Sequence, residues 1–164
     1  MKHYIRVGRK FVGLSNVMGL YYNACKKEFS TTCPPVTEVL GVCVDEDQDF
    51  YTICSIRNSE AKSYEEAVNY ANSLGGYIPN VAELLKVIEH PDLHPMLFKS
   101  WQYETRLIWA SANRGNVNNM RKRIVNSYTG DIYPPETKYL FANSLPRAFR
   151  VFYKIRKEDV YANI

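Results

Sequence analysis

The chain has 164 residues, of which 46% are hydrophobic and 23% are charged, and these proportions are typical of a folded globular domain. They exclude intrinsic disorder, which requires few hydrophobic residues and a high net charge. The net charge of +4 is too small to predict nucleic-acid binding by itself.

The N-terminal region lacks the pattern of a secretory signal peptide. Arg6, Arg9 and Lys10 interrupt the stretch where such a peptide has its apolar run. Elsewhere no apolar stretch approaches the length of a membrane-spanning helix. We therefore expect a soluble protein that is made in the cytoplasm.

Strand-like runs dominate the first third of the chain. Residues 4–7 and 10–12 flank a Gly-Arg pair, as in a two-residue β-hairpin. Residues 15–35 are of mixed character and end in two prolines, which predicts a long irregular loop. Residues 39–44 and 50–54 are rich in β-formers and predict a second hairpin across an acidic loop.

Two helices are predicted from their capping residues. Residues 63–66 (S-Y-E-E) have the capping-box pattern, and the glycines at 75 and 76 predict the C-terminal end of the first helix. Residues 80–83 (N-V-A-E) repeat the pattern for a second helix, which Pro91 ends.

The remaining elements are strands. Residues 106–110 predict a buried strand with Trp109 in the core, and residues 121–128 and 131–133 predict a hairpin. Residues 149–156 alternate between two sets of side chains, which predicts one final strand.

This order segregates the helices from the strands, which predicts an α+β fold and not a parallel α/β sheet. We predict a single domain over residues 1–164, with an N-terminal β-hairpin region (1–62) and a second region (63–164).

The second region resembles the C-type-lectin-like fold, in the bacterial and phage branch of unknown function that is related to the formylglycine-generating enzymes. The residues that carry the resemblance are Y-E-E-A at 64–67, L-G-G-Y-I-P at 74–79, A-E-L-L at 82–85, I-W-A-S-A at 108–112, the hairpin at 126–131 and F-R-V at 149–151. The resemblance implies two consecutive helices packed on antiparallel β-hairpins, in a scaffold that displays long loops for recognition. Bacterial and phage members often lie on virions or surfaces.

The chain departs from this family in ways that bear on activity. The formylglycine-generating enzymes bind copper through a cysteine pair late in the fold, and this chain has no cysteine after Cys54. The calcium-dependent sugar motifs of animal lectins are also absent. Oxidase activity and calcium-dependent sugar binding are therefore not implied by the resemblance.

Two places in the chain have a spacing of residues that resembles a metal site. His90 and His94 have zinc-like spacing, but Pro91 interrupts the helix between them, so we expect a surface or capping role. Residues 45, 47 and 49 are aspartates that alternate like the first ligands of a calcium loop, but the Gly and Glu that complete such a loop are missing. We predict a solvated hairpin tip, no metal and no cofactor.

Nucleophilic and phosphate-binding motifs are also missing. The chain has no Gly-rich phosphate loop and no G-x-S-x-G turn. Its four cysteines include no C-x-x-C pair, and free thiols suit a reducing cytosol, although Cys43 and Cys54 are able to form a disulfide if their strands pair. We predict no catalytic residues.

A segment rich in aromatic, arginine and asparagine residues is the predicted binding surface, because such residues anchor interfaces. Its members are Trp101, Tyr103, Asn113, Arg114, Asn116, Asn119 and Arg121. We expect Trp109 to be a core residue and the loop after it to be exposed. An alternative is that the asparagines only serve turns. A second alternative is a basic surface that binds nucleic acid, formed by residues 121–123 with Arg114, Arg150, Lys154 and Arg156.

These patterns favour a non-catalytic recognition or structural module that binds another protein, such as an accessory protein of a phage tail or capsid. The alternative is an intracellular phage-type inhibitor that binds a host defence protein or masks its nucleic-acid site. The corresponding location is a virion or the host cytoplasm.

Overall fold

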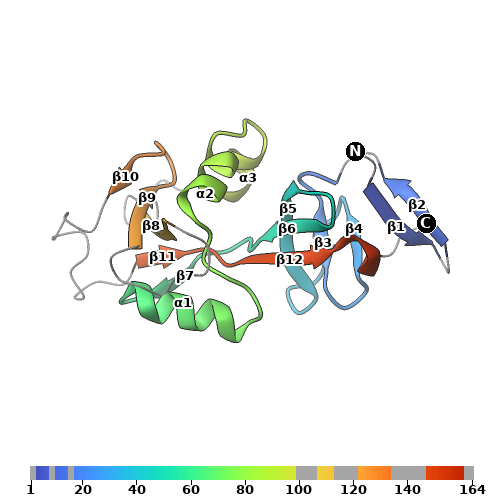
Figure 1. Cartoon of the computed structure of the whole chain (residues 1–164), viewed down its shortest axis with the longest axis horizontal. Helices are drawn as coiled ribbons and strands as arrows, with labels where there is room; N and C mark the ends of the chain where they lie inside the picture. The colour runs from blue at the N-terminus through green and yellow to red at the C-terminus, as the bar shows by residue number, and fades with distance from the viewer. Residues whose placement is uncertain are drawn as a thin grey trace. The chain divides into compact units, whose positions relative to one another are not determined.

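The computed structural model describes residues 3–7, 10–14, 17–98, 107–112, 122–133 and 147–160, and only the backbone of the first two ranges. It confirms an α+β fold with two antiparallel-rich sheets and three α-helices among the described residues (Figure 1). None of the helices in these ranges is long and apolar enough to cross a membrane.

The chain divides into two compact units. Unit 1 consists of Met1–Ile56 with Tyr153–Ile164, and unit 2 consists of Arg57–Phe152. The first boundary between the units lies six residues before the predicted boundary at 62/63. The C-terminal segment belongs to unit 1, and the sequence patterns did not predict this assignment. That the whole chain folds as one domain stays a prediction.

Unit 1 is built from strands. Its elements are β1 (His3–Val7), β2 (Lys10–Leu14), β3 (Tyr21–Asn23), β4 (Glu28–Ser30), β5 (Val39–Glu46), β6 (Phe50–Cys54), β12 (Phe152–Arg156, whose first residue belongs to unit 2) and a 3-10 turn at Lys157–Asp159. The larger sheet has the order β12-β6-β5-β3-β4, and β1 pairs with β2 (Figure 1). Both predicted hairpins are confirmed, with Val7 opposite Lys10 in the first.

The prediction of an irregular loop at 15–35 was wrong, because β3 and β4 form a short hairpin there. The side chain of Asn23 accepts hydrogen bonds from the N–H groups of Cys25 and Lys26, and Lys27 has a φ of 55°. These features complete a tight turn, which a pattern of strand propensity does not reveal in segments of three residues.

Aromatic packing forms the core of unit 1. The ring of Phe29 lies 5.1 Å from that of Tyr22 and 5.0 Å from that of Tyr51, in tilted and edge-on arrangements that aromatic pairs prefer. Val160 is fully buried in the same cluster. The C-terminal segment therefore contributes to the core that the N-terminal strands form.

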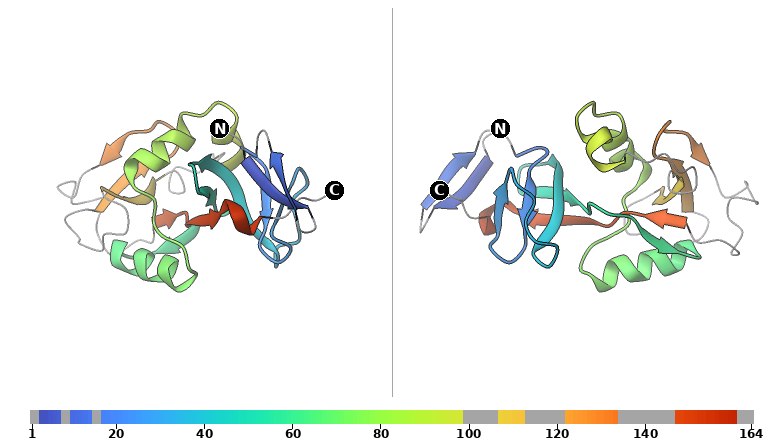
Figure 2. Two further views of the ribbon diagram at one scale, coloured as in Figure 1. Left: turned by 45° about the vertical axis from the view of Figure 1, so that its right-hand side comes forward. Right: turned by 180° about the vertical axis from the view of Figure 1, so that it is seen from behind.

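Unit 2 combines the helices with the second sheet. Its elements are β7 (Ser59–Ala61), α1 (Tyr64–Ser73), α2 (Val81–Ile88), α3 (Leu93–Leu97), β8 (Leu107–Ser111), β9 (Lys122–Asn126), β10 (Ile132–Tyr133) and β11 (Arg147–Phe149). The sheet order is β10-β9-β8-β11-β7. Within this unit, α1 lies to one side of the strands and α2 with α3 to the other (Figure 2).

The helix boundaries follow the capping residues. Asn80 and Glu83 form the predicted capping box at the start of α2. Ser63 accepts the N–H of Glu66, but the Glu66 carboxylate accepts the N–H of Lys62, so the second half of the predicted box is not formed. Residues 71–76 end α1 in a Schellman arrangement, with φ of 80° at Gly75.

The predicted final strand at 149–156 was wrong, since it is two strands in two sheets. β11 ends at Phe149 and β12 begins at Phe152. Arg150, Val151 and Phe152 are all at most 5% exposed, so no alternation of buried and exposed residues exists across the break. Arg150 looked like an outward-facing residue because its charge fits a period of two, whereas its side chain is buried by specific partners.

Candidate functional site

The predicted binding residues lie outside the described residues. This holds for Trp101, Tyr103, Asn113, Arg114, Asn116, Asn119 and Arg121. Trp109, which is predicted to lie in the core, is 2% exposed, and its ring lies 6.1 Å from that of Tyr64. The core position of Trp109 is therefore confirmed, while the binding role of the segment stays a prediction.

The register of β8 and β9 shows at which ends of this strand pair the predicted binding segment is connected to the described residues. Leu107 lies opposite Asn126, and Ser111 lies opposite Lys122. Residues 101–106 therefore precede the Asn126 end of the β8–β9 pair, and residues 113–121 join the other end. The five residues of β8 span about 17 Å, so the two parts of the predicted surface attach well apart.

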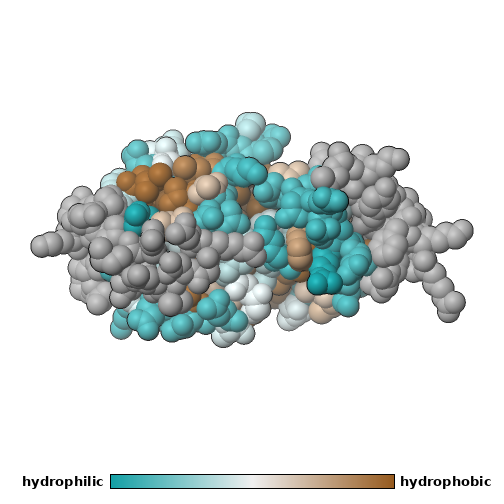
Figure 3. Space-filling view, in the orientation of Figure 1, coloured by the Kyte–Doolittle hydropathy of each residue, from teal (hydrophilic) through white to brown (hydrophobic). Residues whose placement is uncertain are grey.

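The turn between β9 and β10 lies at the Asn126 end and exposes large apolar side chains. The side-chain oxygen of Asn126 accepts hydrogen bonds from the N–H groups of Tyr128 and Thr129 at 2.9 and 3.1 Å. The turn thereby holds Tyr128 at 57% exposure, and Ile132 follows at 44%. Hydrophobic surface gathers over β10 and α2 (Figure 3). The sequence pattern predicted this hairpin, but it did not predict that Tyr128 and Ile132 are exposed.

The side chains of His90 and His94 make structural contacts. Nδ1 of His90 accepts hydrogen bonds from the N–H groups of Asp92 and Leu93 at 3.1 and 3.2 Å, which confirms the predicted capping role. Nε2 of His94 lies 2.7 Å from the carbonyl oxygen of Ser127 and donates to it. Each histidine thus uses a ring nitrogen for backbone contacts. The described part of the chain has no group of three or more residues able to hold a metal ion.

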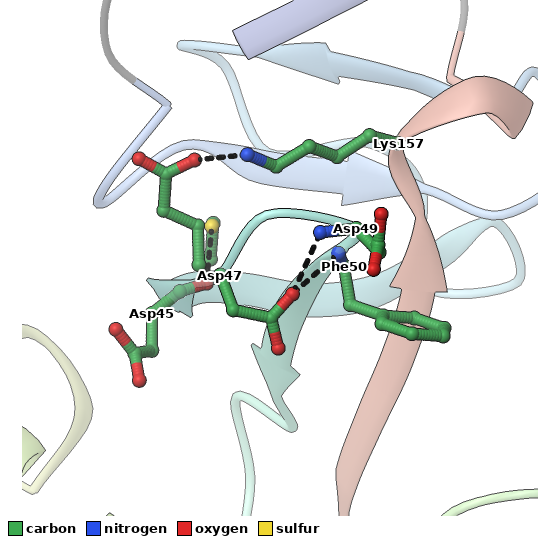
Figure 4. Close-up of polar contacts among 7 residues, drawn as sticks. Asp45, Asp47, Asp49, Phe50 and Lys157 are labelled. Atoms are coloured by element: carbon green, nitrogen blue, oxygen red, sulfur yellow. Dashed lines mark hydrogen bonds and ion pairs between the residues drawn. The ribbon is translucent and has the colours of Figure 1, made fainter. Parts of the chain in front are cut away.

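Backbone contacts also organise the acidic hairpin loop. One carboxylate oxygen of Asp47 accepts the N–H groups of Asp49 and Phe50 at 2.9 and 2.8 Å (Figure 4). Although burial acts to raise its pKa, these bonds and nearby lysines hold the pKa of Asp47 below its usual value. The loop is ordered by its own amides, as is typical of a solvated hairpin tip.

The basic residues of the C-terminal segment have separate roles. Arg150 belongs to unit 2, and its exposed fraction is 5%. Lys154 donates to the Thr52 hydroxyl, and Arg156 pairs with Glu158 on an exposed surface of unit 1. The predicted basic surface was therefore wrong in including Arg150, because its guanidinium points into unit 2.

The thiols of Cys25 and Cys33 are exposed, those of Cys43 and Cys54 are buried, and none of the four forms a disulfide. Cys43 lies opposite Ile53, and Cys54 lies opposite Val42, so the two thiols occupy adjacent rungs and point to opposite faces of the sheet. A disulfide between them is excluded by this register. Burial raises the pKa of the Cys43 thiol to about 12, which leaves it an inert core residue.

Comparisons with known proteins give no relative: no family model, no curated protein and no solved structure matches the chain.

Proposed function

We propose that the chain is a non-catalytic recognition module that binds another protein through unit 2. One observation carries this proposal. Tyr128 and Ile132 are exposed on the β9–β10 hairpin, at the end of β8 that the predicted segment with Trp101 and Tyr103 precedes. Tyrosine is enriched among the residues that contribute most of the binding energy at protein interfaces, and exposed apolar side chains next to it add area that a partner is able to bury.

The finer proposal is that unit 2 has a C-type-lectin-like fold and that the protein is a phage tail or capsid component. In support, unit 2 runs from a strand through helices and hairpin strands to a last strand, and β11 pairs antiparallel with β7. This order agrees with helices packed on antiparallel hairpins. The engagement of His90, His94, Asp47 and Cys43 in structural contacts also supports a non-catalytic role.

Affinity capture with two matched variants tests the proposal. Tyr128→Ser combined with Ile132→Ser removes the exposed apolar residues of the hairpin, and Val36→Ser removes a residue of unit 1 that is 72% exposed. We expect the control to retain the wild-type partner and the double variant to lose it. If both variants retain the partner equally, this hairpin has no part in binding. A partner from purified particles supports the virion role, and a host protein supports the inhibitor.

A further inference from the structure

His94 joins α3 to the turn between β9 and β10. Its Nε2 lies 2.7 Å from the carbonyl oxygen of Ser127, and because a carbonyl oxygen only accepts, the imidazole donates this hydrogen bond. The same ring lies 6.3 Å from the ring of Tyr128 and 6.4 Å from that of Phe98. One half-buried side chain therefore lies against two successive residues of the turn, although His94 and Ser127 are 33 residues apart in the chain.

The turn is closed by its own hydrogen bonds. The N–H of Gly130 donates to the carbonyl oxygen of Asn126 at 2.7 Å, and the N–H of Asn126 donates to that of Asp131 at 2.8 Å. All of these atoms belong to residues 126–131, so they set the internal shape of the turn. Its orientation towards the helices needs contacts from outside the turn. His94 supplies one from α3, and Leu85 of α2 lies near Gly130, where a β-carbon would be 3.6 Å from its Cδ2.

Burial changes sharply at the residue that His94 binds. Ser127 is 1% exposed, whereas Tyr128 is 57% exposed. A carbonyl oxygen of a buried residue needs a hydrogen-bond partner, since losing its contact with water is costly. The imidazole of His94 provides this partner for Ser127. The bond therefore favours the arrangement in which Ser127 stays inside and Tyr128 points outside.

Several contacts hold α3, the helix that carries His94. Nδ1 of His90 accepts the N–H groups of Asp92 and Leu93 at its first turn. The guanidinium of Arg150 donates to the carbonyl oxygen of Leu97 at its last residue. The side chains of Leu93 and Leu97 are 2% and 3% exposed. The imidazole of His94 is thus presented to the turn from a helix that is fixed at both ends.

We propose that His94 is a positioning residue for the binding hairpin, because it holds Tyr128 in the exposed arrangement before a partner arrives. This inference rests on the proposed function, since it names a residue that prepares the same site. A side chain that is already held in place loses less freedom on binding, so the arrangement increases affinity. A histidine with only a structural role would stabilise unit 2 without a specific effect on the turn.

Amide hydrogen exchange of the full-length chain, measured by NMR, tests the inference. His94→Phe keeps a ring next to Tyr128 but removes the donor, and His94→Gln restores an N–H donor at a similar reach. His90→Phe is the matched control, because it makes the same substitution at a histidine that contacts only the backbone of α3. The exchange rate at Gly130 in the turn is compared with that at Ile124, which is fully buried in β9.

We expect His94→Phe to raise the exchange rate at Gly130 relative to Ile124 by about fivefold, the factor that corresponds to the loss of one hydrogen bond. His94→Gln should restore the wild-type ratio, and His90→Phe should leave it unchanged. An unchanged ratio in His94→Phe, or the same rise in His90→Phe, overturns the inference. If His94→Phe does not fold, His94→Ala replaces it with the same expected rise.

Affinity capture then connects the turn to binding. We expect His94→Phe to retain less of the wild-type partner and His94→Gln to retain it fully. Full retention by His94→Phe, where Tyr128→Ser with Ile132→Ser loses the partner, overturns the positioning role and leaves the proposed function intact. The exchange measurement needs no partner, so failure of the proposed function appears separately, as the absence of any captured protein.

Discussion

The ammonium nitrogen of Lys157 lies 2.7 Å from a carboxylate oxygen of Glu46, and the two side chains are 8% and 22% exposed. The same nitrogen lies 5.3 Å from the centroid of the Tyr51 ring, and the backbone N–H of Lys157 donates to Asp49. Lys157 thereby attaches the C-terminal segment to β5 and to the acidic hairpin loop. No local sequence pattern predicts this ion pair, because Glu46 and Lys157 are 111 residues apart in the chain.

Lys157→Ala is expected to lower the free energy of unfolding by about 3 kcal/mol, since it removes the ammonium group that pairs with a partly buried carboxylate. Urea denaturation measures this change. Arg156→Ala is the matched control, because its pair with Glu158 is exposed and such pairs contribute about 0–1 kcal/mol. Equal losses in the two variants would show that the burial of the Lys157 pair has no energetic importance.

Alkaline pH is expected to destabilise unit 1 through Tyr22. Burial, with a further contribution from Asp159, raises the pKa of Tyr22 to about 12 from 10.0. The folded state keeps a proton that the unfolded state loses first, so this contribution is complete below pH 10 and is lost as the pH rises towards 12. Within this window the cost is about 1 kcal/mol per pH unit.

Tyr22→Phe removes this ionisation, so its free energy of unfolding is expected to fall less steeply than that of the wild type between pH 10 and 12. Chemical denaturation across this range measures the two slopes. Part of the slope remains in the variant, because the Cys43 thiol also has a raised pKa. Identical slopes in the two proteins would contradict the assignment to Tyr22.

Thiol labelling is expected to separate the cysteines into two pairs. Cys25 and Cys33 are exposed, whereas Cys43 and Cys54 are buried and donate to backbone carbonyls. Ellman's reagent is therefore expected to titrate two thiols rapidly in the native protein and four in denaturant. Cys25→Ser with Cys33→Ser should abolish the rapid phase, and a rapid third thiol would contradict the burial of the sheet cysteines.

Trp109→Ala is expected to lower the free energy of unfolding by about 3–5 kcal/mol, because it leaves a cavity in the core of unit 2. Ile132→Ala, at a residue that is 44% exposed, should cost much less. Urea denaturation compares the two. A small loss at position 109 would mean that the sheet collapses around the missing ring.

The sequence predicted the features that depend on local chemistry. The capping box at Asn80 and Glu83, the helix end at Gly75 and the buried strand around Trp109 each arise from residues near in the chain. The break between β11 and β12 could not be predicted, because it depends on Arg150 and on partners 53 and 92 residues away.

The central claim is that unit 2 binds another protein, and the predicted binding segment gives its most direct test. Quantitative affinity capture is compared for the wild type, for Arg114→Ala with Asn116→Ala, and for Lys26→Ala with Asn72→Ala, a control that loses the same charge and one amide at exposed positions. We predict that the wild type and the control retain one partner equally, and that the first variant loses it with an unchanged melting temperature. Equal retention by all three proteins, or no retained partner at all, would contradict the account.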